Sequence, residues 1–318
     1  MNTKSNSPQQ KIAQLKRWAL IMLIYAVFVI LWGAWVRISS SGNGCGNHWP
    51  LCNGEAIPVG AHQKTWVEWF HRITSGLFGL FVVYVFFLST KLFNYQRIKI
   101  SASLSLIFMI SEALLGALLV KADLVADNSS LFRLVVMELH FFNSLCLVAS
   151  LLFLYEYSGT YLVFQKNNLI KEQFKRTIKK VILPVAATLV SIIATGIIAA
   201  LANTLFPENS LVMALQNDFL IKSHWLVKAR IIHPTMGLIG GLLLSAFLWM
   251  FQLQLGPEQK FAAIRSQQLI FLVFLTVAAG LLTLFLHAPL AMKLGHLTLI
   301  YGLWVTFLRW INSLIVLN

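Results

Sequence analysis

Long apolar stretches recur along the whole chain and constrain its fold more than any other feature. A helix needs about 20 apolar residues to cross the roughly 30 Å hydrocarbon core of a bilayer, and each stretch reaches that length. Strands of a membrane barrel are excluded, because they would be segments of about ten residues with alternating polarity. The sequence therefore predicts an all-α integral membrane protein with eight transmembrane helices. The expected spans cover 18–38, 66–90, 98–120, 132–155, 180–202, 229–251, 267–287 and 289–312.

The composition excludes the other common classes. Hydrophobic residues make up 58% of the 318 residues and charged residues only 11%, against about 45–50% and about 25% in soluble proteins. A water-soluble globule could not bury so much apolar surface, and a disordered chain needs low hydrophobicity. The net charge of +14 does not indicate nucleic acid, because the charges fall in short runs between apolar stretches. We therefore expect the chain to be surrounded by membrane lipid and to bind no nucleic acid.

The basic residues predict an orientation. If the N-terminus is cytoplasmic, the inner segments hold 16 of the 25 Lys and Arg residues, as the positive-inside rule requires. The first 17 residues contain four basic residues and no acidic residue, and no cleavage-like site follows. We read them as a retained tail. The prediction is a multi-pass protein of the bacterial cytoplasmic (inner) membrane with both termini in the cytoplasm.

The two halves of the chain resemble each other. The second expected span contains His71 followed by Gly76 and Gly79, and the sixth contains His233 followed by Gly237 and Gly240. The fourth and eighth spans also match, through Met137-Glu-Leu-His140 and Met292-Lys-Leu-Gly-His296. This pattern predicts a 4+4 repeat of two pseudo-symmetric four-helix bundles. The expected parts are a cytoplasmic tail (1–17), a first half (18–158), a cytoplasmic linker (159–179) and a second half (180–318).

Four histidines lie inside expected spans, each on an even-numbered one: His71, His140, His233 and His296. Even-numbered spans run inwards, so all four histidines lie within a few turns of the outer surface. A single such histidine could merely hydrogen-bond to a neighbouring helix, but an ionisable group inside a span is a functional hypothesis by default. Paired imidazoles from facing helices are what bis-histidine heme ligation needs. Zinc is less favoured, because no thiolate or carboxylate ligands accompany either pair.

The halves differ three residues before the first histidine of each pair. Glu68 precedes His71, and Arg230 precedes His233. Residues three apart share a helix face, so we expect each charged group to point toward the site of its histidine. A carboxylate can take or relay a proton, whereas a guanidinium cannot act as a base. We therefore assign chemistry to the first half and a fixed cofactor to the second. The alternative for Glu68 is an exposed carboxylate at a helix N-terminus.

Basic residues near the outer ends of spans are candidate partners for heme propionates. The alternative is that these long side chains simply reach the lipid headgroups. The candidates are Arg37, Arg72, Arg133, Lys228, Arg230 and Lys293.

The first outer loop is rich in glycine and asparagine and contains Cys45 and Cys52. On the oxidising side of the membrane the two cysteines could form a structural or redox-active disulfide, or they could remain two thiols. The third cysteine, Cys146, lies in the fourth span and is expected to pack as a small buried hydrophobe.

Several of these motifs together resemble the heme A synthase family, whose members convert heme O to heme A. The likeness extends from the first span to the last, and Glu-x-x-His-Arg after a cysteine loop is its most specific part. The motifs are Gly42-Asn-Gly-Cys45, Trp49-Pro-Leu-Cys52-Asn-Gly, Glu68-Trp-Phe-His71-Arg72, Leu139-His140, His233-Pro and Gly295-His296.

The resemblance implies a role for each motif. It implies that His233 and His296 bind the iron of a heme b cofactor, and that His71 and His140 receive heme O as substrate. It further implies that Glu68 is catalytic and that Cys45 and Cys52 form a loop disulfide. Many family members carry a second cysteine pair in the matching loop of the second half, but 203–228 contains none.

The implied reaction oxidises one ring methyl of heme O to a formyl group through two successive hydroxylations, for assembly of cytochrome oxidase. Expected partners are heme O synthase, oxidase assembly factors, an unidentified electron acceptor or donor, and a second copy of the chain. Two alternatives remain. A diheme b-type electron-transfer protein explains the four histidines but not the contrast between Glu68 and Arg230. A repeat-based transporter would need polar groups at broken helices near mid-bilayer.

Overall fold

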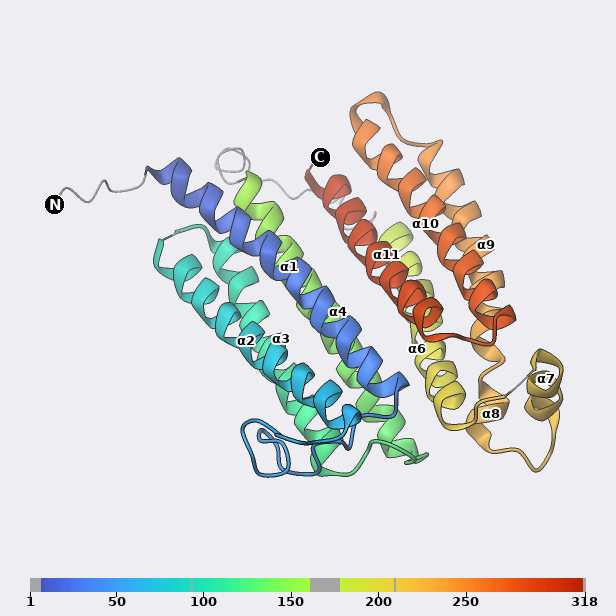
Figure 1. The fold of residues 1–318 in the computed structure, drawn as a ribbon. Coiled ribbons are helices and arrows are strands. Elements are labelled where there is room, and N and C mark those ends of the chain that lie inside the picture. Colours follow the sequence, from blue (N-terminus) through green and yellow to red (C-terminus); the bar gives the residue numbers. More distant parts are fainter. Residues whose placement is uncertain (1–6, 93, 161–177, 209, 317–318) are drawn as a thin grey trace. The chain divides into compact units, whose positions relative to one another are not determined.

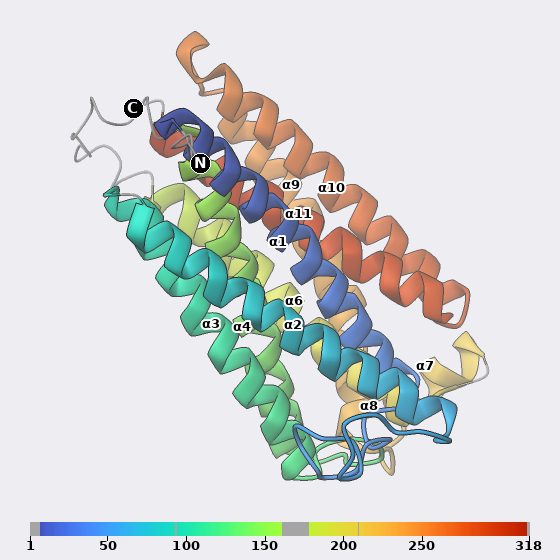
Figure 2. The same cartoon turned by 60° about the vertical axis from the view of Figure 1, so that its left-hand side comes forward.

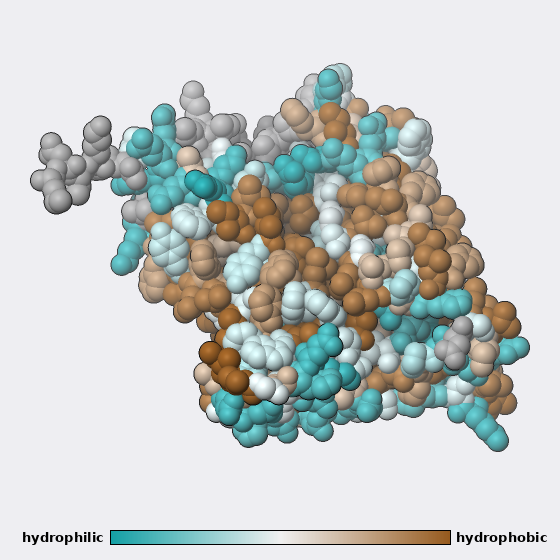
Figure 3. Space-filling view, viewed as in Figure 1, coloured by the Kyte–Doolittle hydropathy of each residue, from teal (hydrophilic) through white to brown (hydrophobic). Residues whose placement is uncertain are grey.

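The computed structural model describes residues 7–92, 94–160, 178–208 and 210–316, which form helices and loops. Within these residues, eight helices are long and apolar enough to cross a membrane. The chain is therefore an all-α, multi-pass membrane protein, as predicted. In Figure 3, hydrophobic side chains cover the middle of the visible helices and hydrophilic ones gather toward their ends. The chain divides into two compact units, which are described separately.

The first unit comprises Met1–Asn128 and Val135–Asn168. Its helices are α1 (Pro8–Ile38), α2 (Gln63–Leu92), α3 (Gln96–Lys121) and α4 (Leu131–Thr160). Figures 1 and 2 both show α2 beside α3, and α2 packs against both α1 and α3. Hydrogen bonds tie α3 to α4, including one from Ser105 Oγ to Ser150 Oγ at 2.9 Å. The core between the helices is apolar and includes Met22, Phe78 and Leu151.

The second unit comprises Ser129–Leu134 and Leu169–Asn318. Its long helices α6 (Leu183–Leu205), α9 (Ile232–Gln252), α10 (Lys260–Phe285) and α11 (Leu290–Val316) pack in the order α6–α9–α10–α11. The remaining elements are a π-helical turn η2 (Ile178–Ile182), α7 (Leu211–Phe219), α8 (Trp225–Ala229) and a 3-10 turn η3 (Pro257–Gln259).

Some helices begin or end at other residues than the predicted spans. α1 begins ten residues before the predicted span, because Ser7 and Gln10 form a capping box and Pro8 suits the first turn. The sixth span, predicted over 229–251, corresponds to α9, and only Ala229 of that range lies in α8. Pro234 has no N–H to donate to the carbonyl of Arg230, and the two helices are separated at Arg230 and Ile231, just before α9 begins.

The parts predicted between and before the bundles are only partly described. Residues 1–6 of the expected tail and 161–177 of the expected linker lie outside the described residues. The short helix α7 was not predicted, because nine residues are too few to stand out as a span.

Candidate functional site

In the first unit, the two histidines expected to pair approach each other from α2 and α4. His71 and His140 are close enough to interact electrostatically. Neither Nδ1 atom makes a hydrogen bond among the described residues, although His140 Nδ1 lies 3.4 Å from Glu112 Oε1. A glycine on the preceding helix faces each ring: a Cβ added to Gly33 would lie 2.9 Å from His71 Cε1, and one added to Gly116 would lie 3.7 Å from His140 Cε1.

The second unit repeats this arrangement. The ring centroids of His233 on α9 and His296 on α11 are 6.3 Å apart, with an angle of 72° between the rings. A Cβ added to Gly196 would lie 3.0 Å from His233 Cε1, and one added to Gly280 would lie 3.1 Å from His296 Cε1. Each histidine in the chain's two pairs therefore packs against a glycine of the helix before it.

These four glycines were not predicted as site residues. The small residues after each histidine were predicted instead. Of those, Gly76 and Gly237 would meet nothing within 4 Å if a Cβ were added, so they border open space. Gly79 and Gly240 serve helix packing, because added Cβ atoms would touch Met109 at 3.1 Å and Ile192 at 3.0 Å.

The pair in the second unit fits the requirements of a bis-histidine heme site. Two metal–imidazole bonds of about 2 Å each, together with the radii of two rings, span a distance like the 6.3 Å between His233 and His296. His233 Nδ1 lies 3.2 Å from the Ile192 carbonyl oxygen. A carbonyl can only accept, so Nδ1 carries the proton and Nε2 keeps its lone pair for a metal. The residues present therefore suit a heme held between two helices.

Glu68 lies one turn before His71 on α2 and is buried, with 3% of its surface exposed. The alternative of an exposed carboxylate is therefore excluded. Cys45 donates its backbone N–H to Glu68 Oε2 at 2.9 Å, and Arg72 donates to Glu68 Oε1 at 2.6 Å. Both oxygens are therefore fixed, one by the cysteine loop and one by the next turn of α2.

The cysteine loop covers the start of α2. Cys45 and Cys52 form a disulfide, which excludes two free thiols. Thr65 donates its hydroxyl to the Gly44 carbonyl at 2.9 Å, and Arg72 donates to loop carbonyls of Gly46, His48 and Leu51. The loop that supplies an N–H to Glu68 is therefore held to the helix that carries Glu68. The remaining cysteine, Cys146, is exposed on α4, contrary to the expectation that it is buried.

Arg230 lies in a different environment from that of Glu68. It caps the C-terminal end of α8, two residues before α9 begins at Ile232. Its guanidinium donates to Asp218 Oδ1 at 2.5 Å, and to the carbonyls of Phe206 and Ala214 at 3.3 and 2.9 Å. Burial raises the pKa of the Asp218 carboxyl, and the hydrogen bond and charge of Arg230 act in the opposite direction. Arg230 thus fastens α7 and α8 to the end of α6.

The other candidate propionate partners lie near helix ends. Lys228 donates to the Ile221 carbonyl at 2.6 Å. Arg37 lies in the last turn of α1, Arg133 near the start of α4 and Lys293 near the start of α11. Propionate binding by any of the six stays a prediction.

A second carboxyl group in the first unit was missed by the sequence analysis. Glu112 on α3 has Oε1 3.4 Å from His140 Nδ1, and its Oε2 accepts from Asn143 Nδ2 at 2.6 Å. It lies 28 residues before His140 and in another helix, so no short spacing connects the two in the sequence. An acidic residue in the middle of an apolar span was the available signal.

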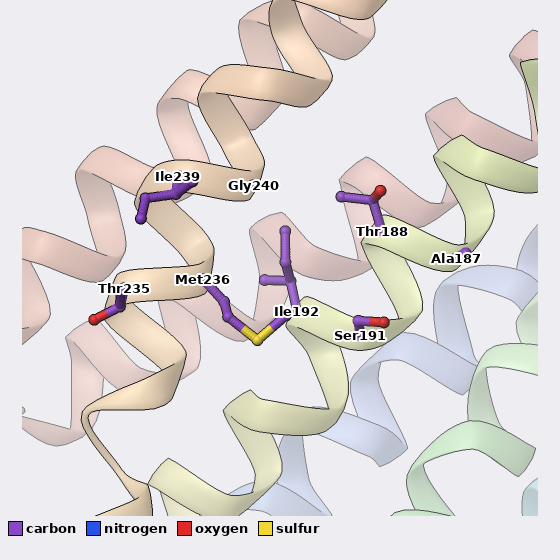
Figure 4. Close-up of a pocket in the computed structure, with 8 residues that line it drawn as sticks. All are labelled: Ala187, Thr188, Ser191, Ile192, Thr235, Met236, Ile239 and Gly240. Atoms are coloured by element: carbon purple, nitrogen blue, oxygen red, sulfur yellow. The ribbon is translucent and has the colours of Figure 1, made fainter.

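The second unit also has a groove, shown in Figure 4. It has a volume of about 390 Å³ and lies between α6 and α9. Ile192 lines it with its side chain while its carbonyl contacts the His233 ring. The groove is mostly apolar, and Thr188, Ser191 and Thr235 add hydroxyl groups to its lining.

Comparison with known proteins agrees with this geometry. A family model described as cytochrome oxidase assembly protein, COX15-CtaA, matches residues 16–308. A Thermus thermophilus protein named protoheme IX farnesyltransferase is 33% identical over 297 residues, which is 93% of this chain and 47% of that protein. A Bacillus cereus protein named heme A synthase is 41% identical over 104 residues, which is 32% of this chain and 33% of that protein.

The matches differ in extent. The chain spans about half the length of the Thermus relative, and the Bacillus match is confined to about a third of each protein. The family model, in contrast, covers most of the chain and includes all four histidines of the two pairs. The chain belongs to the COX15-CtaA family of cytochrome oxidase assembly proteins, the heme A synthase family.

Proposed function

We propose that this protein is a heme A synthase, which oxidises one ring methyl of heme O to the formyl group of heme A. Two successive hydroxylations give a hydrated aldehyde, which loses water. The observation that carries the proposal is the buried Glu68 carboxylate one turn before His71, held by Cys45 N–H and Arg72. Family membership and a relative named heme A synthase support it.

In this proposal the first unit binds the substrate. His71 and His140 hold heme O between α2 and α4, and Gly33 and Gly116 leave room for the two rings. Glu68 holds or passes a proton at the edge of that site, or stabilises positive charge at the methyl carbon. Because its two oxygens are already fixed, the carboxylate loses little freedom when it acts.

The second unit holds the cofactor. His233 and His296 are the proposed ligands of heme b, and the Ile192 carbonyl keeps His233 in the tautomer that binds metal. Heme b, when bound, supplies a one-electron redox centre. The chain's own contribution here is to hold that centre and not to supply acid–base chemistry. Arg230 is paired with Asp218, and no carboxylate replaces Glu68 on α9 within the described residues.

The proposal also covers the partners and the membrane of the protein. Heme O carries a farnesyl tail, and the Thermus relative named protoheme IX farnesyltransferase aligns with nearly all of this chain over about half of its own length. We therefore propose supply of substrate by a heme O synthase, and delivery to oxidase assembly factors. The basic-residue asymmetry supports a bacterial inner membrane with both termini cytoplasmic. The electron acceptor or donor and self-association remain predictions.

The test is Glu68→Gln in the full chain, co-expressed with heme O synthase, followed by extraction and chromatography of the pigments. We expect heme A yield to fall about 100-fold or more, the usual range for loss of an acid–base group, while heme stays bound. The matched control is Glu55→Gln, which removes the same charge from an exposed position of the same loop.

Two outcomes would contradict the proposal. Undiminished heme A in Glu68→Gln would remove that carboxylate from the mechanism. A wild-type protein that binds only heme b, even when heme O is supplied, would instead indicate a diheme electron carrier.

A further inference from the structure

We propose that Glu112 is a positioning residue for the substrate heme, which sets the orientation and electron donation of His140. The inference rests on the proposed function, in which His140 binds heme O. It concerns a residue on α3 that contacts neither Glu68 nor the cysteine loop in any described interaction, so it is independent of the acid–base proposal.

The two oxygens of Glu112 have different neighbours. Oε2 accepts a hydrogen bond from Asn143 Nδ2 at 2.6 Å, and Oε1 lies 3.4 Å from His140 Nδ1. His140 and Asn143 are one turn apart on α4, so they present their polar atoms to α3 from the same face. The carboxyl group therefore connects α3 to the ring at the atom opposite the metal-binding Nε2.

The orientation of Asn143 is fixed by its own partners. Asn143 Nδ2 also donates to the Phe108 backbone carbonyl at 2.8 Å, and a carbonyl can only accept. Asn143 Oδ1 accepts from Ser111 Oγ at 2.6 Å. Both N–H groups of Asn143 are thus committed, one of them to Glu112. This network holds Glu112 in place and directs its remaining oxygen toward His140.

The equivalent position in the second unit has no carboxyl group. Gly280 faces His296 as Gly116 faces His140, and the residue four before Gly280 is Thr276, whereas the residue four before Gly116 is Glu112. The backbone of Thr276, a neutral group, lies beside the His296 ring. His233 likewise has the neutral Ile192 carbonyl. Among the four histidines, only His140 has a carboxyl group beside its ring in the part of the chain that the structure describes.

A carboxylate partner changes what a ligating imidazole does. It fixes the ring and its tautomer and raises the basicity of the nitrogen that binds metal. A more basic ligand stabilises the oxidised metal, so it lowers the reduction potential. We therefore expect Glu112 to make the heme of the first unit harder to reduce than it would be with a neutral partner, and to leave the heme of the second unit unaffected.

The experiment is a potentiometric titration of the purified full-length protein loaded with heme O and heme b, followed by optical and electron paramagnetic resonance spectra. In Glu112→Gln, which keeps the shape and the contact with Asn143, we expect the midpoint potential of the first heme to rise and its low-spin signal to shift. The second heme serves as an internal reference. The matched control is Glu138→Gln, which removes a carboxyl group from α4 two residues before His140.

A second variant introduces the same carboxyl group into the second unit. Thr276→Glu places a carboxyl group at the equivalent position of the second unit, and we expect it to lower the midpoint potential of the second heme. Selective loss of the first heme in Glu112→Gln, with rescue in Glu112→Asp, also supports the proposal, since the ring would then have lost its orientation.

The proposal is overturned if Glu112→Gln keeps both hemes with both potentials and signals unchanged. It is also overturned if Glu138→Gln produces the same shift, because the effect would then be a general one of charge. These failures appear only in the variants. Failure of the proposed function would appear in the wild-type protein, as absence of heme from the first unit or of heme A from the product.

Discussion

The two units share a scaffold and differ in where they place their charges. In both, a glycine of one helix faces a histidine of the next, twice per unit. In both, an arginine–carboxylate pair fastens the loop region to the bundle: Arg72 with Glu68 in the first unit, and Arg230 with Asp218 in the second. The two pairs lie on different elements. Glu68 and Arg72 are both on α2, the helix that carries His71, whereas Asp218 lies on the loop helix α7 and Arg230 caps α8.

That difference explains how one fold can provide two functions. Only the first arrangement leaves a carboxylate one turn from a proposed ligand histidine, where it can handle a proton. Glu112 beside His140 adds to the same contrast. The first unit therefore collects acidic groups around its histidines, while the second surrounds them with neutral ones.

Removing a histidine from either unit tests this division most severely. We expect His71→Ala to abolish binding of heme O and leave heme b in place, and His233→Ala to remove heme b alone. Loss of an outer partner of a metal ligand costs 10–100-fold in affinity, so loss of the ligand itself should cost more than about 100-fold. Pigment extraction after purification from cells supplied with heme O measures both.

The comparison breaks if the assignments are exchanged. Loss of heme b from His71→Ala, with heme O retained, would show that the first unit holds the cofactor. Loss of both pigments in either variant, with the fold intact by circular dichroism, would show that the two sites are not independent.

The glycines opposite the histidines provide a smaller and more selective test. We expect Gly33→Ala to displace the His71 ring, since the new Cβ would lie 2.9 Å from Cε1, and Gly196→Ala to displace His233 in the same way. Overpacking costs about 1–3 kcal/mol, which corresponds to roughly 10–100-fold weaker heme binding in the unit concerned. A heme titration of each variant, followed by its absorption spectrum, measures this loss.

Gly76→Ala and Gly237→Ala are the matched controls, because each adds the same methyl group on the histidine-bearing helix where nothing lies within 4 Å. We expect both controls to bind heme as the wild-type protein does. Weaker binding would show that heme itself occupies the space beside these two glycines. Equal binding by Gly33→Ala and wild type would show that the glycine contact does not limit the position of the ring.

The sequence predicted the features that depend on composition and near spacing. Eight spans followed from hydropathy, and the histidines were conspicuous because ionisable residues are rare in spans. Arg230 shows the limit of spacing rules. Its separation of three residues from His233 predicted a guanidinium directed toward the site of that histidine, but the guanidinium donates to Asp218 Oδ1. Spacing along a helix does not reveal which partner on another element a long side chain reaches.

Contacts between helices were the features that the sequence did not reveal. Glu112 meets His140, and Gly33 meets His71, only after the helices pack, and such pairs have no fixed separation along the chain. The repeat offers a signal that a single histidine does not. Gly33 and Gly196 stand at nearly the same separation as His71 and His233, as do Gly116 and Gly280. An alignment of the two halves by their histidines would have identified these glycines as equivalent positions.

Serines between helices give the smallest predicted effect. Ser105 Oγ donates to Ser150 Oγ between α3 and α4, and Ser266 Oγ accepts from Trp310 Nε1 between α10 and α11, each at 2.9 Å. We expect Ser105→Ala to cost about 0.6 kcal/mol, the average for such bonds in membrane proteins, because Ser150 still donates to the Leu147 carbonyl. Unfolding of the detergent-solubilised protein measures the cost.

The second unit should respond more strongly to the same substitution. Ser266→Ala leaves the N–H of the fully buried Trp310 without its hydroxyl acceptor, and an unsatisfied buried donor costs about 1–3 kcal/mol. Neither serine contacts a histidine of the pairs, so both variants should keep their pigments and their heme A yield. Equal costs in the two units would mean that the indole finds another acceptor or water. A change in pigment would mean that the scaffold and the charged sites, which the comparison treats as separable, are coupled.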